Sequence, residues 1–465
     1  MTAVSAEIVS RNPADPDDVV LAVSPSGGID VDRAVGTARG AAGAFARMPA
    51  PARGEALRAA ADALADRADE LAGLVVREVG KPITESRGEI ARAVAILRFY
   101  AGVVLDPEGE SYPPADGRSL LLTRRAPRGV VGLITPWNFP IAIPVWKLAP
   151  ALAYGNACVW KPSEHAPACA AVLTELLAEH LPEGVVQLIQ GGGEAGSALV
   201  AHPDVTAVSF TGSERVGRSV AVALAERGAA AQCEMGGQNA SIVLADADIE
   251  AAAAMIASAA MGYAGQKCTA TGRVVCEAPV LPAMRDALVA AVERMTIEHP
   301  DDAGCQVGPL ISSQARDAAV AAVTRATESG GRLLTGGRVL DTPGHYLTPT
   351  LIEVDDPGAE IAQREVFAPV CALLEAADAG RAAEISRGVR YGLSTAVYTR
   401  DLDRALELVR SLDTGLVRIN QPTAGVDFHV PFGGEKASGF GPREQGRAAR
   451  DFYTSTRTVL VSPSR

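Results

Sequence analysis

Val130-Val131-Gly132-Leu133-Ile134 is the stretch that decides the fold, because a short, uninterrupted apolar run is typical of a strand buried on both faces. Beyond it, strand-like apolar runs alternate with helix-length segments. Repeated strand–helix–strand units of this length predict a parallel sheet covered by helices on both faces, a doubly wound nucleotide-binding lobe. The predicted elements are helices near 141–153, 166–180 and 213–227, and strands at 156–161, 184–190, 205–210 and 231–235.

A second alternating region predicts another α/β lobe, starting at Ala240-Ser241-Ile242-Val243-Leu244 and ending near residue 430. On the N-terminal side, apolar residues at three- and four-residue steps predict one long helix over 53–80 and a second over about 83–103. The tail from Phe452 to Val461 alternates like an exposed edge strand, a site of pairing with another subunit. The remaining predicted elements are helices 248–262, 280–294 and 311–328 and strands 272–277 and 394–398.

The composition excludes several classes of protein. The 465 residues include Lys+Arg 43 and Asp+Glu 55, and the net charge of -12 argues against a broad nucleic-acid surface. No run of about 18 strongly apolar residues occurs, so we expect no membrane-spanning helix. Met1 to Asn12 has no secretory pattern, and the seven cysteines form no CxxC pair. We therefore expect a cytoplasmic protein with reduced thiols.

Two glycine-bearing segments compete as phosphate sites. Gly191-Gly192-Gly193-Glu194-Ala195-Gly196 satisfies GxGxxG between a strand and a helix, but an ordinary turn explains it at least as well. In Phe210-Thr211-Gly212-Ser213-Glu214-Arg215-Val216-Gly217 a strand ends and a helix begins, so free N–H groups and the Ser213 hydroxyl could hold a phosphate. An ordinary Ser N-cap fits equally well, and the residues alone leave both possibilities open.

Three side chains are candidates for chemistry. Cys268 lies in the polar loop Gly265-Gln266-Lys267-Cys268-Thr269, where a thiol can act as a nucleophile, although a buried inert thiol is the alternative. Glu234 follows an apolar strand and suits a base with a raised pKa, or a strand-end salt bridge. Asn138 offers an amide donor for an oxyanion hole, or an Asx-turn. The six histidines are dispersed, and no GxSxG, Walker loop or HExxH occurs, so we expect no metal.

Seven motifs follow one another along nearly the whole chain, from about residue 12 to 461. They are TPWNFP at 135–140, WKPSE at 160–164, FTGSERVG at 210–217, EMGG at 234–237, GQKCT at 265–269, EVFAPV at 365–370 and PFGGEKASGFG at 431–441. Together they resemble the aldehyde dehydrogenase superfamily. NFPIAIPVWKLAPALAYGN, GQKCTAT, and GLVRIN followed by TAGVDFHVPFGG and PREQG are most similar to its α-ketoglutarate semialdehyde (2,5-dioxovalerate) dehydrogenase branch.

The resemblance implies an α/β fold with a Rossmann-like cofactor lobe, a catalytic lobe and a small β oligomerisation arm, in a homodimer or homotetramer. It also implies the domain boundaries: residues 1–110 and 128–236 for the NAD(P)-binding domain, 237–446 for the catalytic domain, and 111–127 with 447–465 for the arm.

The implied activity is NAD(P)+-dependent oxidation of an aldehyde to a carboxylic acid. Cys268 matches the nucleophile that forms a thiohemiacetal and then a thioester, Asn138 and the Cys268 N–H match the oxyanion hole, and Glu234 matches the base that activates water. Lys147 and Glu444 match a supporting proton-relay pair, although GFGPRE is one residue longer than the family's commoner GxGRE.

The family pattern also implies a cofactor site. Glu164 matches a position at the adenosine ribose, and its carboxylate would accept from a free 2′-OH and repel a 2′-phosphate, so NAD+ is favoured while NADP+ stays open. GSERVG is the family's glycine motif, which makes GGGEAG a turn near the adenine. The expected cofactor residues are Ile134, Trp137, Lys161, Ser163, Glu164, Phe210, Gly212, Ser213, Val216, Met235, Glu365 and Phe367.

The substrate pocket is implied by Phe139, Trp146 and Phe432, which match pocket-lining positions. If the branch holds, the aldehyde carries a distant carboxylate that needs a cation. Arg98 and Arg418 are the candidates, and a surface salt bridge is the alternative for each.

Other functions stay open beside this one. An aliphatic or aromatic aldehyde is an alternative substrate. A CoA-acylating semialdehyde dehydrogenase would release the thioester to CoA, but such enzymes usually lack the base that Glu234 matches. A non-catalytic binding protein on the same fold would not need Cys268, Glu234 and Asn138 together.

Overall fold

The computed structural model describes residues 7–463, so the Met1–Asn12 segment, in which no secretory signal is expected, lies partly outside the described residues. One lobe is built on a six-stranded sheet that is parallel except at one edge, where the two-residue strand β19 pairs antiparallel to β9. The strand order is β19 (Gly439–Phe440), β9 (Ala230–Met235), β8 (Val205–Gly212), β5 (Val130–Ile134), β6 (Ala157–Lys161) and β7 (Val186–Leu188).

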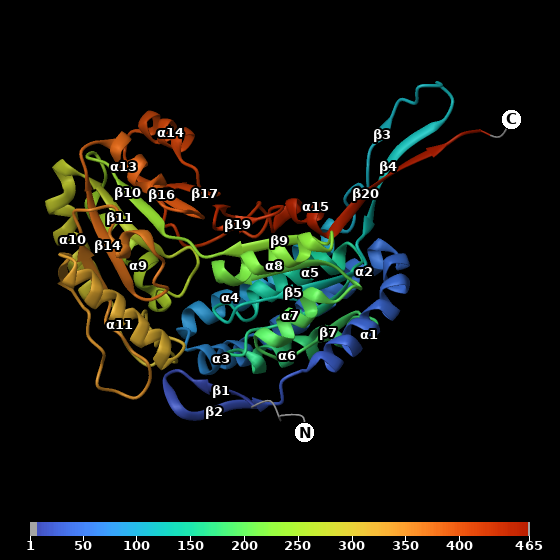
Figure 1. The fold of residues 1–465 in the computed structure, drawn as a ribbon, viewed down its shortest axis with the longest axis horizontal. Coiled ribbons are helices and arrows are strands. Elements are labelled where there is room, and N and C mark those ends of the chain that lie inside the picture. The colour runs from blue at the N-terminus through green and yellow to red at the C-terminus, as the bar shows by residue number, and fades with distance from the viewer. Residues whose placement is uncertain (1–6, 464–465) are drawn as a thin grey trace.

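Helices cover both faces of this sheet because alternate residues of the buried strands point to opposite sides. Val131 and Leu133 pack into one hydrophobic core and Val130 and Ile134 into another. The first core is closed by α2 (Ala50–Asp66), α3 (Ala68–Val79), α4 (Ile83–Val103), α5 (Ala142–Ala153) and α6 (Pro167–Ala178). The second is closed by α1 (Gly28–Arg47), α7 (Gly193–Ala201) and α8 (Glu214–Glu226). The doubly wound layout expected from the sequence is confirmed (Figure 1).

The second lobe is a separate seven-stranded sheet with its own core, at the left of Figure 1. Only its edge strand β12 runs antiparallel to its neighbour. The strand order is β12 (Arg332–Thr335), β13 (Thr350–Glu353), β14 (Val370–Ala376), β11 (Thr271–Glu277), β10 (Asn239–Val243), β16 (Ser394–Tyr398) and β17 (Leu416–Ile419). Its helices are α9 (Ile249–Met261), α10 (Leu281–Glu293), α11 (Ser313–Glu328), α12 (Glu360–Gln363), α13 (Ala379–Arg387) and α14 (Leu402–Ser411). Outside the two lobes lie the hairpin β1 (Ile8–Asn12) and β2 (Asp15–Val23) and the short pair β15 (Tyr391–Gly392) and β18 (Glu435–Lys436).

The prediction of one long helix over 53–80 is wrong in one respect: this segment forms two helices, α2 and α3, with a break at Arg67. Arg67 leaves the helical conformation with φ −103° and ψ 19°, and its guanidinium donates two hydrogen bonds to Glu70 in the first turn of α3. Leu57 and Leu71 lie in the same core on either side of the break, so the apolar spacing continues across it and hides it.

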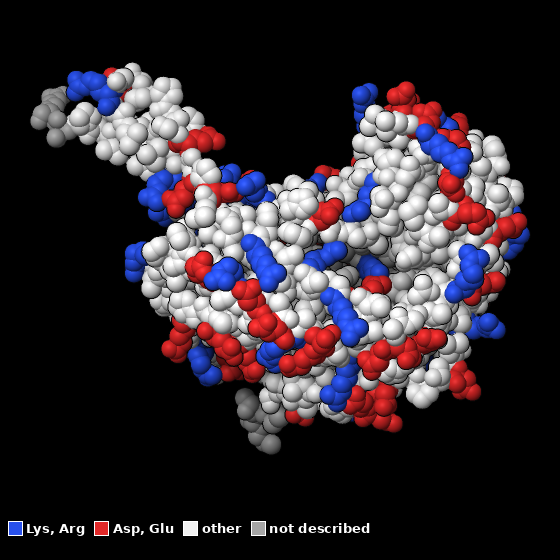
Figure 2. Space-filling view, turned by 180° about the vertical axis from the view of Figure 1, so that it is seen from behind, with Lys and Arg blue, Asp and Glu red and all other residues white. Residues whose placement is uncertain are grey.

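A three-stranded arm projects from the first lobe, the one built on the six-stranded sheet (Figure 1). It consists of β3 (Ser111–Tyr112), β4 (Leu120–Pro127) and β20 (Thr454–Val461), which follows α15 (Ala449–Tyr453). β20 pairs antiparallel with β4 along its whole length, from Thr454 opposite Pro127 to Val461 opposite Leu120. Most of the arm's visible surface is uncharged (Figure 2), and Tyr112, Leu120 and Leu460 are exposed.

Charges of both signs are interspersed over the body of the protein in Figure 2, without a continuous basic stripe on that face. Such a distribution suits a protein whose net charge is -12. Within residues 7–463, no helix combines the length and hydropathy that a membrane span requires.

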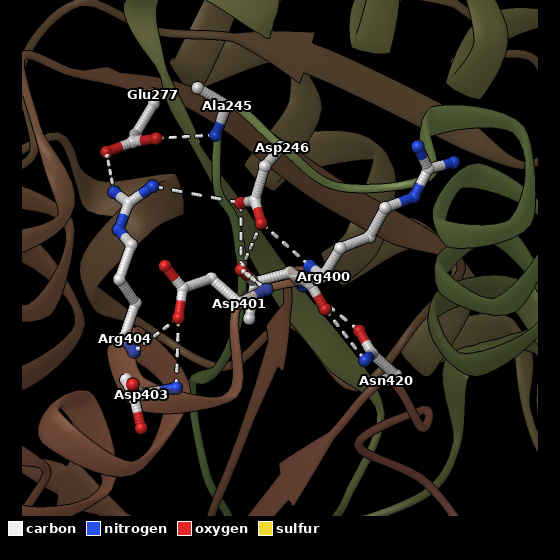
Figure 3. A network of polar contacts seen from close by, with 9 residues as sticks. Ala245, Asp246, Glu277, Arg400, Asp401, Asp403, Arg404 and Asn420 are labelled. Carbon is white, nitrogen blue, oxygen red and sulfur yellow. Dashed lines mark hydrogen bonds and ion pairs between the residues drawn. The ribbon is translucent and has the colours of Figure 1, made fainter.

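A polar network ties the carboxyl ends of β10, β16 and β17 together (Figure 3). Asn420, just after β17, accepts from the Thr399 N–H at 3.0 Å and donates to the Thr399 carbonyl at 2.8 Å. Asp246, after β10, accepts from the Thr399 hydroxyl and the Arg400 N–H, both at 2.8 Å. The strand end that carries Arg418 is therefore held in place by its neighbours.

Candidate active site

Cys268 lies on a loop that an unusual backbone turn aims at the gap between the lobes. Tyr263, Ala264 and Gly265 have positive φ angles of 54°, 52° and 67°. Two successive non-glycine residues in the left-handed region are strained, a condition that concentrates at functional sites. At position 265 only glycine fits, because a Cβ there would lie 2.2 Å from the Ala368 carbonyl oxygen. Six of the seven cysteines are buried, and Cys268 is the partly exposed one.

Two buried amides hold this loop. The Gln266 side chain donates to the Pro309 carbonyl at 3.1 Å and accepts from the Ile311 N–H at 2.9 Å. The Asn239 side chain donates to the carbonyls of Cys268 and Ala270, each at 2.8 Å. Such fully used amides fix the loop against the second lobe. Sequence reasoning gave neither residue a role, although Gln266 lies within the GQKCT motif and Asn239 follows EMGG by two residues.

Asn138 faces the same loop from the first lobe. Its Nδ2 donates to the Gln266 carbonyl at 2.9 Å, which also fixes which end of the amide is nitrogen. A side-chain amide has two N–H groups, so one remains for a second acceptor. Its Oδ1 is buried without a partner among the described residues. The amide is thus held in position with donor capacity left over.

A cleft of about 290 Å³ lies at the carboxyl ends of β5, β8 and β9, the edge where doubly wound sheets bind nucleotides. Its far wall comes from the second lobe, including Phe367, a non-glycine residue with φ 56° whose ring meets the Trp137 ring edge-on at 5.8 Å. The predicted residues that line it are Trp137, Asn138, Gly212, Ser213, Met235, Cys268, Glu365 and Phe367, together with Pro136, Ile143, Thr211 and Gly236.

Other predicted residues lie outside the cleft lining, and several of them make contacts of their own. At the end of β6, the Lys161 Nζ donates to the Gly191 carbonyl at 2.7 Å, so the GGGEAG turn contacts this lysine. Trp146 and Phe432 stack with ring centroids 5.6 Å apart, and the buried Trp146 Nε1 has no partner among the described residues. Phe139 carries the Lys81 ammonium 3.6 Å above its ring. The complete set is Ile134, Lys161, Ser163, Glu164, Phe210 and Val216 from the cofactor prediction, Phe139, Trp146 and Phe432 from the pocket prediction, and Lys147, Glu234 and Glu444 from the catalytic prediction.

The cleft carries groups that suit the pyrophosphate of a dinucleotide. Ser213 is the N-cap of α8 and its side chain makes no capping hydrogen bond, which leaves its hydroxyl and the first-turn N–H groups available to an anion. The neighbouring Thr211 hydroxyl is buried without a partner among residues 7–463. Gly236 lies against the Glu365 side chain, whose carboxylate would have to shift for a Cβ at this position. Free N–H groups and hydroxyls at a helix N-terminus are what a pyrophosphate site needs.

Glu234 is buried, and its carboxylate is turned away from the cleft lining. Its Oε2 accepts from the Gly434 N–H at 3.0 Å, and its Oε1 accepts from the Gln232 side chain at 3.3 Å. Burial raises the pKa of Glu234 well above its ordinary value, and repulsion from Glu444 adds to this. A carboxylate in this state suits a base but must turn to reach water at Cys268.

Lys147 and Glu444 form a buried ion pair whose two charges both act on Glu234. The Lys147 Nζ also donates to the Ser209 hydroxyl at 2.7 Å. The Glu444 Oε2 is buried without a partner among the described residues. A buried charge with an open lone pair is uncommon and is typical of functional positions.

Burial raises the pKa of Cys268 to about 12, with further increases from the charges of Glu365 and Glu234. Burial also raises the pKa of Glu365 to about 7, which a hydrogen bond from the Gly237 N–H partly opposes. Among the described residues, no cation lowers the pKa of Cys268 or Glu365. Without a bound ligand, the thiol is therefore protonated at neutral pH, and its activation needs a base or an arriving positive charge.

The two arginines predicted to meet a substrate carboxylate differ. Arg98 lies in an exposed ion pair with Asp62 at 2.9 Å. The prediction that it meets a substrate carboxylate is therefore wrong, and the alternative, a surface salt bridge, is what the structure shows. The Arg418 guanidinium donates to the Gly425 carbonyl, and its Nε is buried without a partner among the described residues. Sequence reasoning missed Arg92, a half-buried residue on α4 whose side chain has no hydrogen bond or ion pair within residues 7–463. Burial lowers the pKa of Arg92, the charges of Asp427 and Glu89 oppose this shift, and the charge of Arg418 adds to it.

A nucleotide-type cleft between two α/β lobes defines a dinucleotide-dependent enzyme. Residues 1–459 match the model of the aldehyde dehydrogenase family. The chain is 41% identical to an alpha-ketoglutaric semialdehyde dehydrogenase of Bacillus subtilis, covering 97% of this chain and 94% of that protein. It is 35% identical to a 2,5-dioxopentanoate dehydrogenase of Saccharolobus solfataricus, covering 97% and 96%.

Solved structures agree with this assignment. The fold is similar, with a TM-score of 0.95 and 30% identity, to a betaine aldehyde dehydrogenase of Staphylococcus aureus in complex with NAD+, covering 98% of this chain and 92% of that one. A NAD-dependent aldehyde dehydrogenase of Sinorhizobium meliloti gives a TM-score of 0.96 at 33% identity, covering 100% and 93%. The chain belongs to the aldehyde dehydrogenase family. It is an NAD(P)+-dependent oxidoreductase acting on aldehydes.

Proposed function

We propose that the enzyme oxidises α-ketoglutarate semialdehyde to the dicarboxylic acid, with NAD+ preferred over NADP+. The identities with the Bacillus subtilis and Saccharolobus solfataricus relatives support this substrate. The exposed carboxylate of Glu164, which would repel a 2′-phosphate, supports the cofactor preference. The division into residues 1–110 with 128–236, 237–446, and 111–127 with 447–465 is part of the same proposal.

The observation that carries the proposal is the meeting of Cys268, Asn138 and Glu365 in one cleft at the carboxyl ends of the parallel strands. In the proposed reaction, the Cys268 thiol releases its proton and the sulfur attacks the aldehyde carbon, so that the carbonyl oxygen becomes the oxyanion of the thiohemiacetal. The free N–H of Asn138 and the Cys268 backbone N–H stabilise the oxyanion. When bound, NAD+ supplies the hydride acceptor that oxidation of the thiohemiacetal to a thioester requires.

Glu234 completes the proposed cycle. Its carboxylate turns from Gly434 toward Cys268 and takes a proton from water, which attacks the thioester and releases the acid and the thiol. Trp137, Ser213, Lys161 and Glu365 would hold the dinucleotide. A CoA-acylating activity is the alternative, and a buried carboxylate with a raised pKa argues against it because transfer to CoA needs no water.

Arg92 and Arg418 are the proposed anchor for the distal carboxylate. Glu85 on α4 pairs with Lys267, next to Cys268, at 2.8 Å. Arg92 lies seven residues further along the helix, about 10 Å away at the α-helical rise, and close enough to Arg418 for their charges to repel. Asp427 and Glu89 offset this repulsion without forming an ion pair with Arg92 among the described residues, so its guanidinium keeps donors for a substrate carboxylate.

A substrate screen tests this function. Purified enzyme with NAD+ or NADP+ is assayed against α-ketoglutarate semialdehyde, succinate semialdehyde, an aliphatic aldehyde and benzaldehyde. We expect α-ketoglutarate semialdehyde to have the highest kcat/KM, acid to form without CoA, and Arg92→Gln to raise KM roughly 10- to 100-fold for the acidic substrates alone. Arg98→Gln, on the same helix but paired at the surface, is the matched control. Better turnover of uncharged aldehydes contradicts the substrate proposal.

The arm supports a further proposal, that the enzyme is a homodimer or homotetramer. Exposed apolar residues on strands with free edges favour pairing with a second copy. Light scattering at micromolar concentration should give a dimer or tetramer mass, and a monomer mass would contradict this.

A further inference from the structure

A chain of buried hydrogen bonds links Lys147 to Glu234 through two side chains that the reaction described above does not use. The Lys147 ammonium donates to the Ser209 hydroxyl at 2.7 Å. The Ser209 hydroxyl donates to the Gln232 Oε1 at 2.6 Å, and the Gln232 Nε2 donates to the Glu234 Oε1 at 3.3 Å. Ser209 and Gln232 are at most 1% exposed, so water does not compete for these bonds.

Every link in this chain points the same way, from the cation toward the carboxylate. Ser209 has a single hydroxyl hydrogen, and the Gln232 oxygen at 2.6 Å is a closer acceptor than the Glu444 Oε1 at 3.1 Å. A hydroxyl that accepts from an ammonium becomes a better donor, and the amide beyond it is polarised in the same sense. The positive charge of Lys147 is therefore felt at Glu234 more strongly than distance alone allows.

The charges around Glu234 make this connection matter. Glu444 repels the ionised carboxylate, while Lys147 and Arg443 attract it. The thiols of Cys233 and Cys268 are its other titratable neighbours. Only two side-chain or backbone groups donate directly to the Glu234 carboxylate within the described residues, the Gly434 N–H and the Gln232 amide. Losing one of two donors at a buried carboxylate favours its protonated form.

We propose that Ser209 and Gln232 are positioning residues that couple the Lys147 ammonium to the Glu234 carboxylate through aligned hydrogen bonds and so keep the base ionised for thioester hydrolysis. No proton travels along this chain, because the Gln232 amide keeps its hydrogens. The two residues act on the ionisation and orientation of Glu234 and do not touch the substrate. This inference rests on the proposed role of Glu234 as the base.

Two variants break the chain at different links, Ser209→Ala and Gln232→Met. In each, we expect the pH midpoint of thioester hydrolysis to rise by about 0.5–1 unit, because Gln232→Met removes a donor to the carboxylate and Ser209→Ala removes the link that polarises this donor. At neutral pH this lowers the hydrolysis rate roughly three- to tenfold. The initial burst of NADH, which precedes hydrolysis, should keep its rate and amplitude. Stopped-flow absorbance measures both phases across the neutral and alkaline range.

Spectroscopy of the cofactor-free protein gives a second reading. The infrared C=O band of protonated Glu234, assigned as the band that Glu234→Gln removes, should persist to higher pH in Ser209→Ala and Gln232→Met than in the parent. Ser241→Ala is the matched control, a serine equally buried in a central strand of the other sheet, and it should change neither midpoint. Thermal unfolding checks that each variant folds.

The outcomes distinguish the proposed role of Glu234 as the base from the proposed role of Ser209 and Gln232. If Glu234→Gln keeps full hydrolysis, the proposed base is wrong and the inference fails with it. If Glu234→Gln stops hydrolysis but both chain variants keep the parental pH midpoints, only the inference is overturned. A loss of burst rate and thermal stability without a pH shift would likewise overturn it, since Ser209 and Gln232 would then serve packing alone.

Discussion

Two lysine–glutamate pairs are buried in the protein, and they are used differently. In the first, Lys81 pairs with Glu89, and both side chains are 0% exposed. The Glu89 Oε1 accepts from the N–H groups of Ile141 and Ala142 at the start of α5, each at 2.9 Å. Lys81 also lies over the Phe139 ring. Both Glu89 oxygens and the lysine are therefore satisfied by the scaffold.

The second pair, Lys147 and Glu444, is equally deep but incomplete. The Glu444 Oε2 has no partner among the described residues, and Lys147 shares its hydrogens with Ser209. A buried ionic group is costly unless every lone pair is used, so the incomplete pair is held for another purpose. The comparison teaches that saturation of hydrogen bonds separates the structural pair from the one that serves Glu234.

Breaking the saturated pair of Lys81 and Glu89 should have the largest effect of these variants, and the effect should be a loss of stability. Glu89→Gln leaves the Lys81 charge buried without a counter-ion, and we expect a loss of about 3–5 kcal/mol in the free energy of unfolding. Turnover per folded molecule should change little. Urea denaturation measures the loss, and Glu55→Gln, in an exposed pair with Arg58, is the control that should leave stability nearly unchanged. A Glu89 variant as stable as the parent would contradict the structural assignment.

Glu444→Gln, in the incomplete pair, should act on pH dependence instead. The Glu444 charge raises the pKa of Glu234, so its removal should lower the pH midpoint of thioester hydrolysis by roughly 0.5–1 unit. The shift in the pH midpoint has the opposite sign to that expected for Ser209→Ala. Glu444→Gln removes a charge that repels the ionised Glu234, whereas Ser209→Ala weakens a hydrogen bond that stabilises it. The same stopped-flow pH series measures both. A rise in the midpoint for Glu444→Gln would refute the electrostatic account of this pair.

Glu365 sharpens the comparison because it is a half-buried carboxylate with no cationic partner among the described residues. Its pKa is raised to about 7 by burial, so it ionises as the pH passes neutrality. If the ionised form accepts from the cofactor, NAD+ affinity should increase a few-fold between pH 6 and 8, below the tenfold-per-unit limit of a single proton. Titration calorimetry at several pH values checks this, and Glu365→Gln should bind NAD+ with little pH dependence. An unchanged slope in that variant would assign the titration to another group.

Much of the fold could be predicted from local patterns. The strand at 130–134 and the alternation after it fixed the parallel sheet, because both features are local and strongly periodic. The break at Arg67 could not be predicted, since α2 and α3 bury their apolar residues in the same core and the spacing continues across it. The N-terminal hairpin and α1 also lay outside the predicted elements.

The site was less predictable where it depends on tertiary contacts. Cys268, Asn138 and Glu365 stood in motifs, and their convergence in one cleft follows from the strand order. The orientation of Glu234 toward Gly434 depends on a residue 200 positions away, which no local pattern encodes. Ser209 and Gln232 carry no sequence signal beyond being polar residues inside apolar strands, and that mismatch could have marked them. Arg92 went unnoticed because a helical arginine is usually solvent-exposed.

The most direct test of the account is to trap the acyl group on the enzyme. Glu234→Gln is mixed with NAD+ and α-ketoglutarate semialdehyde, denatured in acid, and examined by intact-protein and peptide mass spectrometry. We expect one added acyl group on the peptide that contains Cys268, with one NADH formed per acyl group, and no adduct in Cys268→Ala. An unmodified Cys268 after NADH has formed, or an acyl group on another cysteine, would contradict the central claim that this sulfur carries the reaction.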